Sequence, residues 1–358
     1  MQPRPVEGAR PARKPPSTPH HSPGENKTMG PGARHPFRIV FSIACAMLVG
    51  GCYWTPNAGT DANSRADANV VLTGARGLVT QGDLDAALLE FNRAIAINPR
   101  LGPAHMGAAE IHRVKGNYEA AEKNYGTAAS IEPANFNAQY MHGLMLQLLD
   151  RATDAVRAYL RALSIKPADF DANLNLATTF LQLKEPDQAL AYGKRAVELN
   201  PQSGAARVNL GAVYRGLGRH ADAVTEYQQA AELMELRTEL LLNLADSLGR
   251  VGRYAEMSNT LGQLVKTDPS ALAYERLASA LFRMGEHDEA LVHFNLSLEL
   301  DPNHFPALNG VGVCLLNRYL LSNKSNETSR LEALGALRRS LQIERNQPRV
   351  VELLSRYG

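Results

Sequence analysis

A period of 34 residues runs through most of this sequence and constrains the fold more than any other feature. Four similar strings, AINPR, SIEPA, SIKPA and ELNPQ, place their prolines 34 residues apart, at Pro99, Pro133, Pro167 and Pro201. An alanine stands twelve residues before each proline and a small residue stands twenty-four before it; these are Ala87, Ala121, Ala155 and Ala189, and Ala75, Ala109, Gly143 and Ala177. The same marks continue to an eighth unit at Gly312 and Ala333. Self-similarity of this length predicts a stack of similar units in place of one globular core.

Each unit predicts two helices. In DLDAALLEFNRAIAI, apolar residues recur at three- and four-residue spacing, which is typical of an amphipathic helix. A glycine marks the break between the two helices in five units, at Gly82, Gly116, Gly218, Gly252 and Gly285, and the proline ends the second helix. The small residues predict close approach of the two helices, and large residues such as Phe91 and Tyr159 fill the remaining space.

This pattern resembles the tetratricopeptide repeat over about residues 68–347. The resemblance implies an all-α fold, a right-handed α-solenoid of about eight helix pairs. The end unit of such a stack needs a solvated cover. The segment PRVVELLSRYG, residues 348–358, is therefore predicted to be a C-terminal capping helix.

Two units depart from the period. The junction AELMELRTELLL lacks its proline and has Glu235 there, which predicts either helices that run on or a bend in the superhelix. In the eighth unit the interval from Gly312 to Ala333 is 21 residues, against the usual 12. The nine extra residues lengthen the first helix, the loop or both, and we interpret them either as a surface insertion or as a partner contact.

The N-terminal region differs in composition from the repeats. Residues 1–28 are basic and rich in proline, which predicts a disordered leader, or an untranslated one if synthesis begins at Met29. Residues 29–51 have the order of an export signal: Arg34 and Arg38, a short apolar run, then small residues. The run is about a dozen residues, whereas a spanning helix needs roughly 20, so a permanent transmembrane helix is disfavoured.

The string Val49-Gly50-Gly51-Cys52 resembles the lipobox of a bacterial lipoprotein. The resemblance implies cleavage before Cys52 and attachment of lipid to its thiol, and several acyl chains give stable anchoring. Residues 52–67 are then the anchor and a flexible tether. Tyr53 stands where an aspartate favours the inner membrane in some lineages, so we expect the outer membrane, with the body in the periplasm. Ordinary secretion and a cytosolic protein with a chance apolar run are the alternatives.

Composition and motifs argue against catalysis. From Cys52 onward the chain has 31 Lys/Arg and 34 Asp/Glu residues, so its charge gives no indication of nucleic-acid binding. The sequence contains no phosphate-binding glycine loop, no H-E-x-x-H and no C-x-x-C. We interpret His105 and His112 as structural histidines and Cys314 as a buried, unreactive thiol. The sequence predicts no enzyme, no metal site, no cofactor and no small-molecule substrate.

The resemblance implies that the first helix of each pair lines a concave groove that holds a peptide or protein. Asn175, Asn209 and Asn243 recur at 34 residues and predict a ladder of amides along this wall. An amide both donates and accepts hydrogen bonds, so the ladder either pairs with an extended peptide or bonds to neighbouring repeats. Further groove candidates are Tyr140, Arg215 and Arg276.

These features together predict a non-catalytic interaction scaffold, lipid-anchored in a bacterial cell envelope. The combination of signal and repeats resembles assembly factors of type IV and tight-adherence pili, which implies a role in pilus or secretion-system assembly. A general adaptor for envelope hydrolases or peptidoglycan machinery is the alternative, as is a soluble cytosolic adaptor if the signal is not used.

Overall fold

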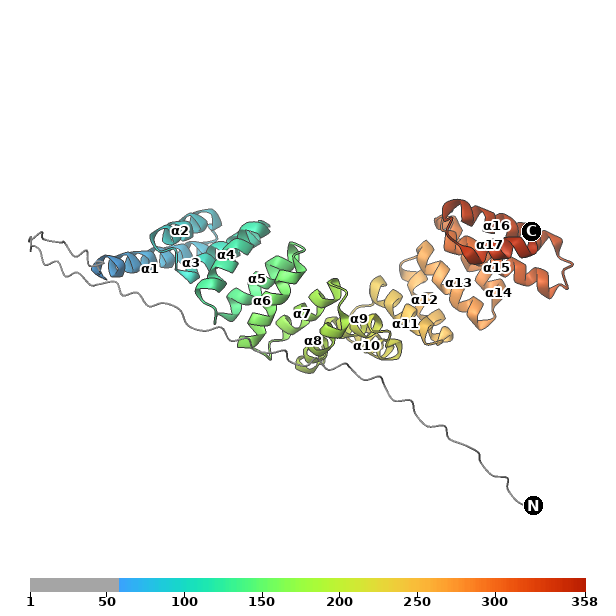
Figure 1. Cartoon of the computed structure of the whole chain (residues 1–358), viewed down its shortest axis with the longest axis horizontal. Helices are drawn as coiled ribbons and strands as arrows, with labels where there is room; N and C mark the ends of the chain where they lie inside the picture. The colour runs from blue at the N-terminus through green and yellow to red at the C-terminus, as the bar shows by residue number, and fades with distance from the viewer. Residues whose placement is uncertain (1–57) are drawn as a thin grey trace, which may run out of the picture. The chain divides into compact units, whose positions relative to one another are not determined.

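The computed structural model describes the backbone of residues 58–358 and the side chains from residue 66 onward. This part of the chain contains seventeen helices and no strand, in the order shown from blue to red in Figure 1. The helices are α1 (Ala58–Gln81), α2 (Leu84–Ile97), α3 (Gly102–Val114), α4 (Tyr118–Ile131), α5 (Phe136–Leu148), α6 (Ala152–Ile165), α7 (Phe170–Gln182), α8 (Pro186–Leu199), α9 (Gly204–Gly216), α10 (His220–Leu233), α11 (Thr238–Arg250), α12 (Tyr254–Thr267), α13 (Ala271–Met284), α14 (His287–Leu300), α15 (Phe305–Leu321), α16 (Glu327–Ile343) and α17 (Pro348–Tyr357).

The helices pack in eight successive pairs, and α17 covers the last one. Each odd-numbered helix from α1 to α15 packs on the even-numbered helix that follows it, and each pair packs on the next. The all-α solenoid of eight pairs with a capping helix, which the resemblance to the tetratricopeptide repeat implies, is confirmed. First helices of successive pairs also contact one another, for example α7 with α9 and α13 with α15, while second helices do so to a lesser extent. First helices therefore line the inner side of the stack.

Small residues on one helix of a pair receive large side chains from its neighbour. A Cβ atom added at Gly143 would lie 2.9 Å from the ring of Tyr159, and one at Gly211 would lie 2.7 Å from that of Tyr227. The repeated alanines of both helices are fully buried, as at Ala109 and Ala121. The predicted close approach is thus achieved with the density of a protein interior.

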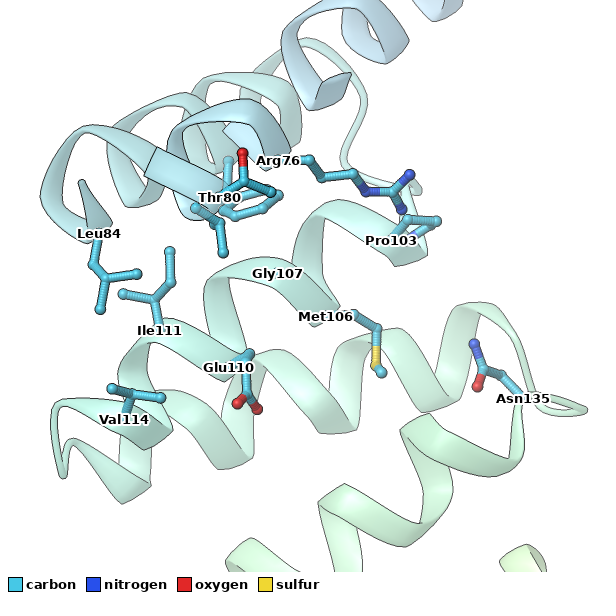
Figure 2. A pocket seen from close by; sticks show the side chains of 12 residues that line it. Arg76, Thr80, Leu84, Pro103, Met106, Gly107, Glu110, Ile111, Val114 and Asn135 are labelled. Atoms are coloured by element: carbon cyan, nitrogen blue, oxygen red, sulfur yellow. The ribbon is translucent and has the colours of Figure 1, made fainter. Parts of the chain in front are cut away.

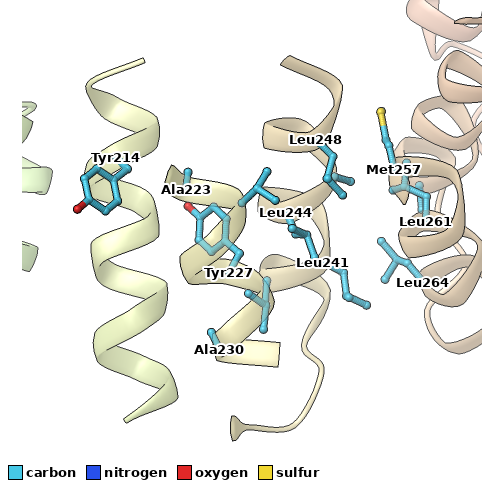
Figure 3. Close-up of a cluster of buried hydrophobic side chains, with 14 of the residues drawn as sticks. Tyr214, Ala223, Tyr227, Ala230, Leu241, Leu244, Leu248, Met257, Leu261 and Leu264 are labelled. Atoms are coloured by element: carbon cyan, nitrogen blue, oxygen red, sulfur yellow. The ribbon is translucent and has the colours of Figure 1, made fainter. Parts of the chain in front are cut away.

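The sixth pair fills the same space with different side chains. Met257 stands where the other units have alanine, and Leu261 stands where five of the other seven units have an aromatic residue; both are buried. In Figure 3 these side chains and Leu264 face Leu241 and Leu248 of α11, while Tyr227 of α10 lies on the opposite side of α11. The core is therefore continuous across the junction that lacks its proline.

At that junction the helices do not run on. Helix α10 ends at Leu233 and α11 begins at Thr238, so the linker is as long as the one between α2 and α3. Met234 adopts an extended conformation with φ −145° and ψ 164°. Its side chain covers Gly204, where an added Cβ would lie 2.9 Å from the Met234 sulfur atom. Of the two alternatives, the continuous helix is wrong, because packing of Met234 ends α10 without a proline.

The turns inside the pairs share one backbone conformation. All five glycines predicted at these breaks have positive φ, from 71° at Gly218 to 90° at Gly285. The third and fourth pairs place Asp150 and Lys184 at the equivalent position, with φ of 57° and 60°. A left-handed residue is therefore part of this turn whether or not glycine supplies it.

The nine extra residues of the eighth pair lengthen every part of the hairpin. Compared with α3, helix α15 is four residues longer, and compared with α4, helix α16 is three residues longer. The other two residues lie in the loop at 322–326, where Asn323 and Lys324 both have positive φ. The extension exposes Leu321 and Leu331 at 74% and 59% of their surface.

The N-terminal helix begins earlier than the predicted array. Helix α1 starts at Ala58, ten residues before the start at residue 68, so part of the predicted tether (52–67) is helical. Alanines at Ala58, Ala62 and Ala66 favour this conformation over a flexible chain. No helix in the described part of the chain has both the length and the apolar character needed to cross a membrane. The predicted leader, signal and Cys52 lie outside the described residues.

Candidate functional site

The inner face follows one register on the first helices. Asn175, Asn209 and Asn243 occupy equivalent positions, and the residues three and seven further along lie on the same face of each helix. On α11 these are Asp246 and Arg250, and on α13, counting from Arg276, they are Ser279 and Arg283. Both pockets described below are lined by residues of this register. It therefore defines the candidate interaction face.

The asparagine ladder is bonded within the stack at two of its three positions. The Asn175 amide donates to the Tyr140 hydroxyl at 3.0 Å, and the Asn209 amide donates to Thr178 Oγ1 at 2.7 Å. Each bond joins the first helix of one pair to that of the preceding pair. Asn209 Oδ1 is buried and has no hydrogen-bond partner among the described residues. Asn243 is half-buried at the same position on α11.

Tyr140 belongs to an aromatic cluster on the inner side of the third pair. Its ring stacks on Phe136 with centroids 5.8 Å apart, and it lies 5.9 Å from the ring of Tyr159. Burial raises the pKa of Tyr140, and nearby Asp171 and Asp169 raise it further. The hydroxyl is therefore a neutral acceptor for Asn175 and fixes the spacing of α5 and α7.

Arg215 and Arg276 are both exposed but have different surroundings. Arg215, on α9, lies near the buried hydroxyl of Tyr227, whose pKa is raised by burial and lowered by the arginine charge. Arg276 lines a pocket with other arginines. The sequence candidates thus do not meet in one site. Asn175 bonds to Tyr140, Asn209 bonds to Thr178, and Arg215 lies near Tyr227. Arg276 lines the pocket, and Asn243 stands by itself on α11.

An apolar pocket of about 670 Å³ lies over the first two pairs (Figure 2). Arg76 and Thr80 of α1 face Met106, Gly107 and Val114 of α3 across it. The remaining lining residues are Val79, Leu84, Phe91, Pro103, Glu110, Ile111 and Asn135. We call this the apolar pocket.

Glu110 is the carboxylate of the apolar pocket and is held by its neighbours. Its oxygens accept from Arg113 at 2.5 and 2.9 Å and from the Tyr125 hydroxyl at 2.7 Å. The hydrogen bond from Arg113 lowers the pKa of Glu110, against the opposing effect of burial. The carboxylate is therefore already paired, and the open surface of the pocket is mainly apolar.

A second pocket of about 590 Å³ lies over the sixth to eighth pairs, and four arginines line it. They come from α11, α13 and the capping helix α17, and they are Arg250, Arg276, Arg283 and Arg349. The other polar side chains that line it are Asp246, Tyr254, Ser279 and Asn309. Its apolar lining includes Phe282 and Val313. We call this the arginine pocket.

Sequence reasoning found one of these four arginines. Arg250 and Arg283 stand seven residues after Asn243 and Arg276, so the register of the ladder was the available signal. Arg349 carries no such signal, because it comes from the capping helix, outside the repeat.

The two histidines and the cysteine that the sequence analysis considered, His105, His112 and Cys314, have surroundings that fit a structural role. His105 is 8% exposed, and its ring nitrogens lie 3.1 Å from Asn124 Oδ1 and 3.0 Å from the Pro99 carbonyl oxygen. His112 Nδ1 is buried and has no partner among the described residues. Cys314 is buried, and desolvation raises the pKa of its thiol to about 12. A thiol that is so rarely ionised is a poor nucleophile. This agrees with the interpretation of Cys314 as a buried, unreactive thiol.

Residues 58–358 bring together no group of three His, Cys, Asp or Glu side chains that could hold a metal ion, as far as the described side chains extend. The inner face offers amides, hydroxyls, guanidinium groups, the carboxylates of Glu110 and Asp246, and apolar surface. Such groups bind and orient a partner through hydrogen bonds, charge and burial.

The stacked pairs and their lined inner face define a helical-repeat protein of the α-solenoid class. Family models described as tetratricopeptide repeat match residues 72–138 and 108–170, 169–236, and 271–304, together more than half of the chain. The chain belongs to the tetratricopeptide repeat family. Proteins of this family bind protein or peptide partners, so the fold supports a protein-protein interaction scaffold, and no enzyme family is indicated.

Three solved structures illustrate what this chain is similar to. YrrB, described as a TPR protein with an unusual peptide-binding site, is 22% identical, with a TM-score of 0.47 over 55% of this chain and 97% of its own. The pilF protein of Pseudomonas aeruginosa is 19% identical, with a TM-score of 0.48 over 61% and 98%. PilW, a type IV pilus biogenesis factor, is 22% identical, with a TM-score of 0.47 over 60% and 98%. A comparison with curated proteins gave no significant match.

Proposed function

We propose that this protein is a non-catalytic scaffold, lipid-anchored at Cys52 in a bacterial cell envelope, that holds a peptide or protein partner on its inner face. The observation that carries the binding role is the shared register of the first helices, which lines both the apolar pocket and the arginine pocket. The anchoring role is supported by the lipobox-like Val49-Gly50-Gly51-Cys52. A place in pilus or secretion-system assembly, at the outer membrane, is supported by the resemblance of this signal and repeat combination to pilus assembly lipoproteins.

Anchoring is tested by the intact mass and membrane fractionation of the expressed protein beside Cys52→Ala. We expect the wild type to begin at an acylated Cys52 and to fractionate with membranes, and the variant to lose both properties. A full-length, unmodified wild type in the soluble fraction would contradict the anchor and favour a cytosolic adaptor.

Binding is tested by isolating the protein from detergent-solubilised envelopes and quantifying its partners by mass spectrometry. Val114→Lys with Leu148→Lys places charges on exposed first-helix positions, and Leu89→Lys with Leu160→Lys does the same on second helices. We expect the first pair of substitutions to remove the partner and the second pair to retain it. Pilus or secretion components among the lost proteins support the assembly role, and cell-wall hydrolases in their place would point to the adaptor role.

A further inference from the structure

We propose that the arginine pocket binds a segment of the partner protein rich in aspartate and glutamate. This inference deepens the proposed function and rests on it, because it assigns a chemical class to the partner of the inner face. The pocket gathers Arg250, Arg276, Arg283 and Arg349 from three helices that are far apart in the sequence.

These guanidinium groups are not neutralised by the surrounding carboxylates. Among the described residues, no carboxylate lies within 4.0 Å of the side-chain nitrogens of Arg250, Arg283 or Arg349. Arg276 lies 3.5 Å from Glu275, whose side chain is mostly buried, and Asp246 also lines the pocket. Four positive charges thus face two negative ones, and three guanidinium groups are free to pair with an incoming carboxylate.

Helix stability does not account for the cluster. Arg250 and Arg283 lie in the last turns of their helices, where positive charge is favourable. Arg276 lies in the middle of α13, and Arg349 lies in the first turn of α17, where the helix dipole disfavours a cation. Arg276 has Glu275 beside it, whereas Arg349 has no favourable interaction with its own helix end. A bound anionic group would account for the place of Arg349.

The charge of the rest of the chain limits which kinds of ligand the arginine pocket can attract. The chain from Cys52 onward carries more acidic than basic residues. A pocket with net positive charge on such a chain therefore attracts anionic groups to that pocket and not to the rest of the surface. The chain from Cys52 onward is close to neutral and slightly acidic, so outside the pocket it offers no basic surface for nucleic acid. A pocket on the inner face of a solenoid does not reach a flat membrane surface. A narrow acidic segment fits both constraints.

The other lining residues favour a peptide over a small anion. Phe282 and Val313, both half-buried, give apolar surface beside the guanidinium groups. Asn309 Oδ1 has no hydrogen-bond partner among the described residues and can accept from a peptide. An extended peptide points successive side chains to opposite sides, so acidic and apolar side chains of one segment reach both kinds of surface.

The first test is a selection of short random peptides displayed on phage against the full-length protein purified in detergent. We expect the selected peptides to be enriched in Asp and Glu relative to the starting library. Selection against Arg250→Ala with Arg283→Ala should lose that enrichment. Arg161→Ala with Arg338→Ala is the matched control, because it removes the same charge from exposed positions on second helices, and it should retain the enrichment.

The second test is fluorescence anisotropy with one selected acidic peptide and its Glu-to-Gln, Asp-to-Asn counterpart. We expect the pocket variant to weaken binding by about tenfold, which corresponds to the loss of two partly screened ion pairs. The control variant should bind as the wild type does. Binding should weaken as salt is added.

The outcomes separate this inference from the proposed function. Selected peptides without acidic enrichment that still bind the inner face would overturn the acidic class and leave the scaffold standing. Absence of any selected peptide would contradict peptide binding as well. If labelled oligothymidylate bound to the pocket and was lost in the same variant, while the peptides showed no acidic preference, the pocket would be a nucleic-acid site and the inference would be wrong.

Discussion

Gly193 and Gly211 are buried glycines on neighbouring helices, and their surroundings show how closely each repeat is packed. A Cβ atom at Gly193 would make ordinary contacts, the nearest at 3.5 Å from a methyl group of Leu210. At Gly211 it would overlap the Tyr227 ring at 2.7 Å. The same residue type is therefore required at one position and only tolerated at the other.

We expect Gly193→Ala to raise the free energy of unfolding by about 0.5–1 kcal/mol, because alanine costs less backbone entropy in a helix. Gly211→Ala should lower it by about 1–3 kcal/mol, because the Tyr227 ring must move within a close-packed core. Urea denaturation of both variants checks the pair. Equal effects of the two substitutions would contradict the packing account.

His293 gives the stability a dependence on pH. Its ring stacks on Tyr274 with centroids 5.9 Å apart, and its Nδ1 is buried with no partner among the described residues. Burial lowers the pKa of His293 in the folded state. The unfolded chain therefore binds the proton more readily, and the free energy of unfolding falls as the pH drops below the ordinary histidine pKa.

His293→Phe removes this titration while it keeps an aromatic ring at the position. We expect the decrease in the free energy of unfolding between neutral and mildly acid pH to become smaller. Urea denaturation at several pH values measures the change. An unchanged pH dependence would show that His293 does not contribute.

At the scale of the elements, the turn inside each pair depends on one left-handed residue. Glycine supplies it in five pairs, whereas Asp150 and Lys184 adopt the same conformation at a cost. The sequence marks the glycine turns directly, because no other residue type signals a positive φ so clearly. It marks the other two only through their place in the 34-residue period.

Lys184→Gly should raise the free energy of unfolding by up to about 1 kcal/mol, because glycine relieves the left-handed strain and loses part of the gain to backbone entropy. Gly218→Ala, at the equivalent turn, should lower it by about 1 kcal/mol. Thermal unfolding of the two variants compares them. A destabilising Lys184→Gly would mean that the lysine side chain makes an unrecognised contribution.

The period predicted the elements better than it predicted their contacts. Pairing, helix count and the capping helix followed from the repeat, because nearest-neighbour packing fixes them. The direct bond of Asn175 to Tyr140 did not follow, because it depends on side chains of two different pairs meeting across the inner face. The arginine pocket was predicted only at Arg276, since Arg349 reaches it from outside the repeat.

At the scale of the whole molecule, each helix pair is stabilised by packing against its neighbours, and α17 covers the exposed side of the last pair. Val350 is 5% exposed, whereas the adjacent Val351 is 52% exposed. The two valines of the capping helix therefore form a matched pair in which only one contributes to the core.

We expect Val350→Asp to lower the free energy of unfolding by about 2–3 kcal/mol, because it buries an unpaired charge. Val351→Asp should change it by less than about 0.5 kcal/mol. Hydrogen exchange should place the loss of protection in α15, α16 and α17, because units contact only their neighbours. Uniform loss from α1 to α17 would contradict a nearest-neighbour stack.

The inner face changes in chemistry along the stack, from the apolar pocket over the first pairs to the arginine pocket over the last ones. We propose that a partner protein lies along this face. The most direct measurement is site-specific photo-crosslinking in cells of the native host, with a photoreactive residue at Leu148 or Gln182 on first helices, or at Leu89 or Leu160 on second helices. We predict adducts to a partner protein from the two first-helix positions and none from the other two. Adducts from Leu89 and Leu160 alone would contradict the account and move the binding surface to the outer face.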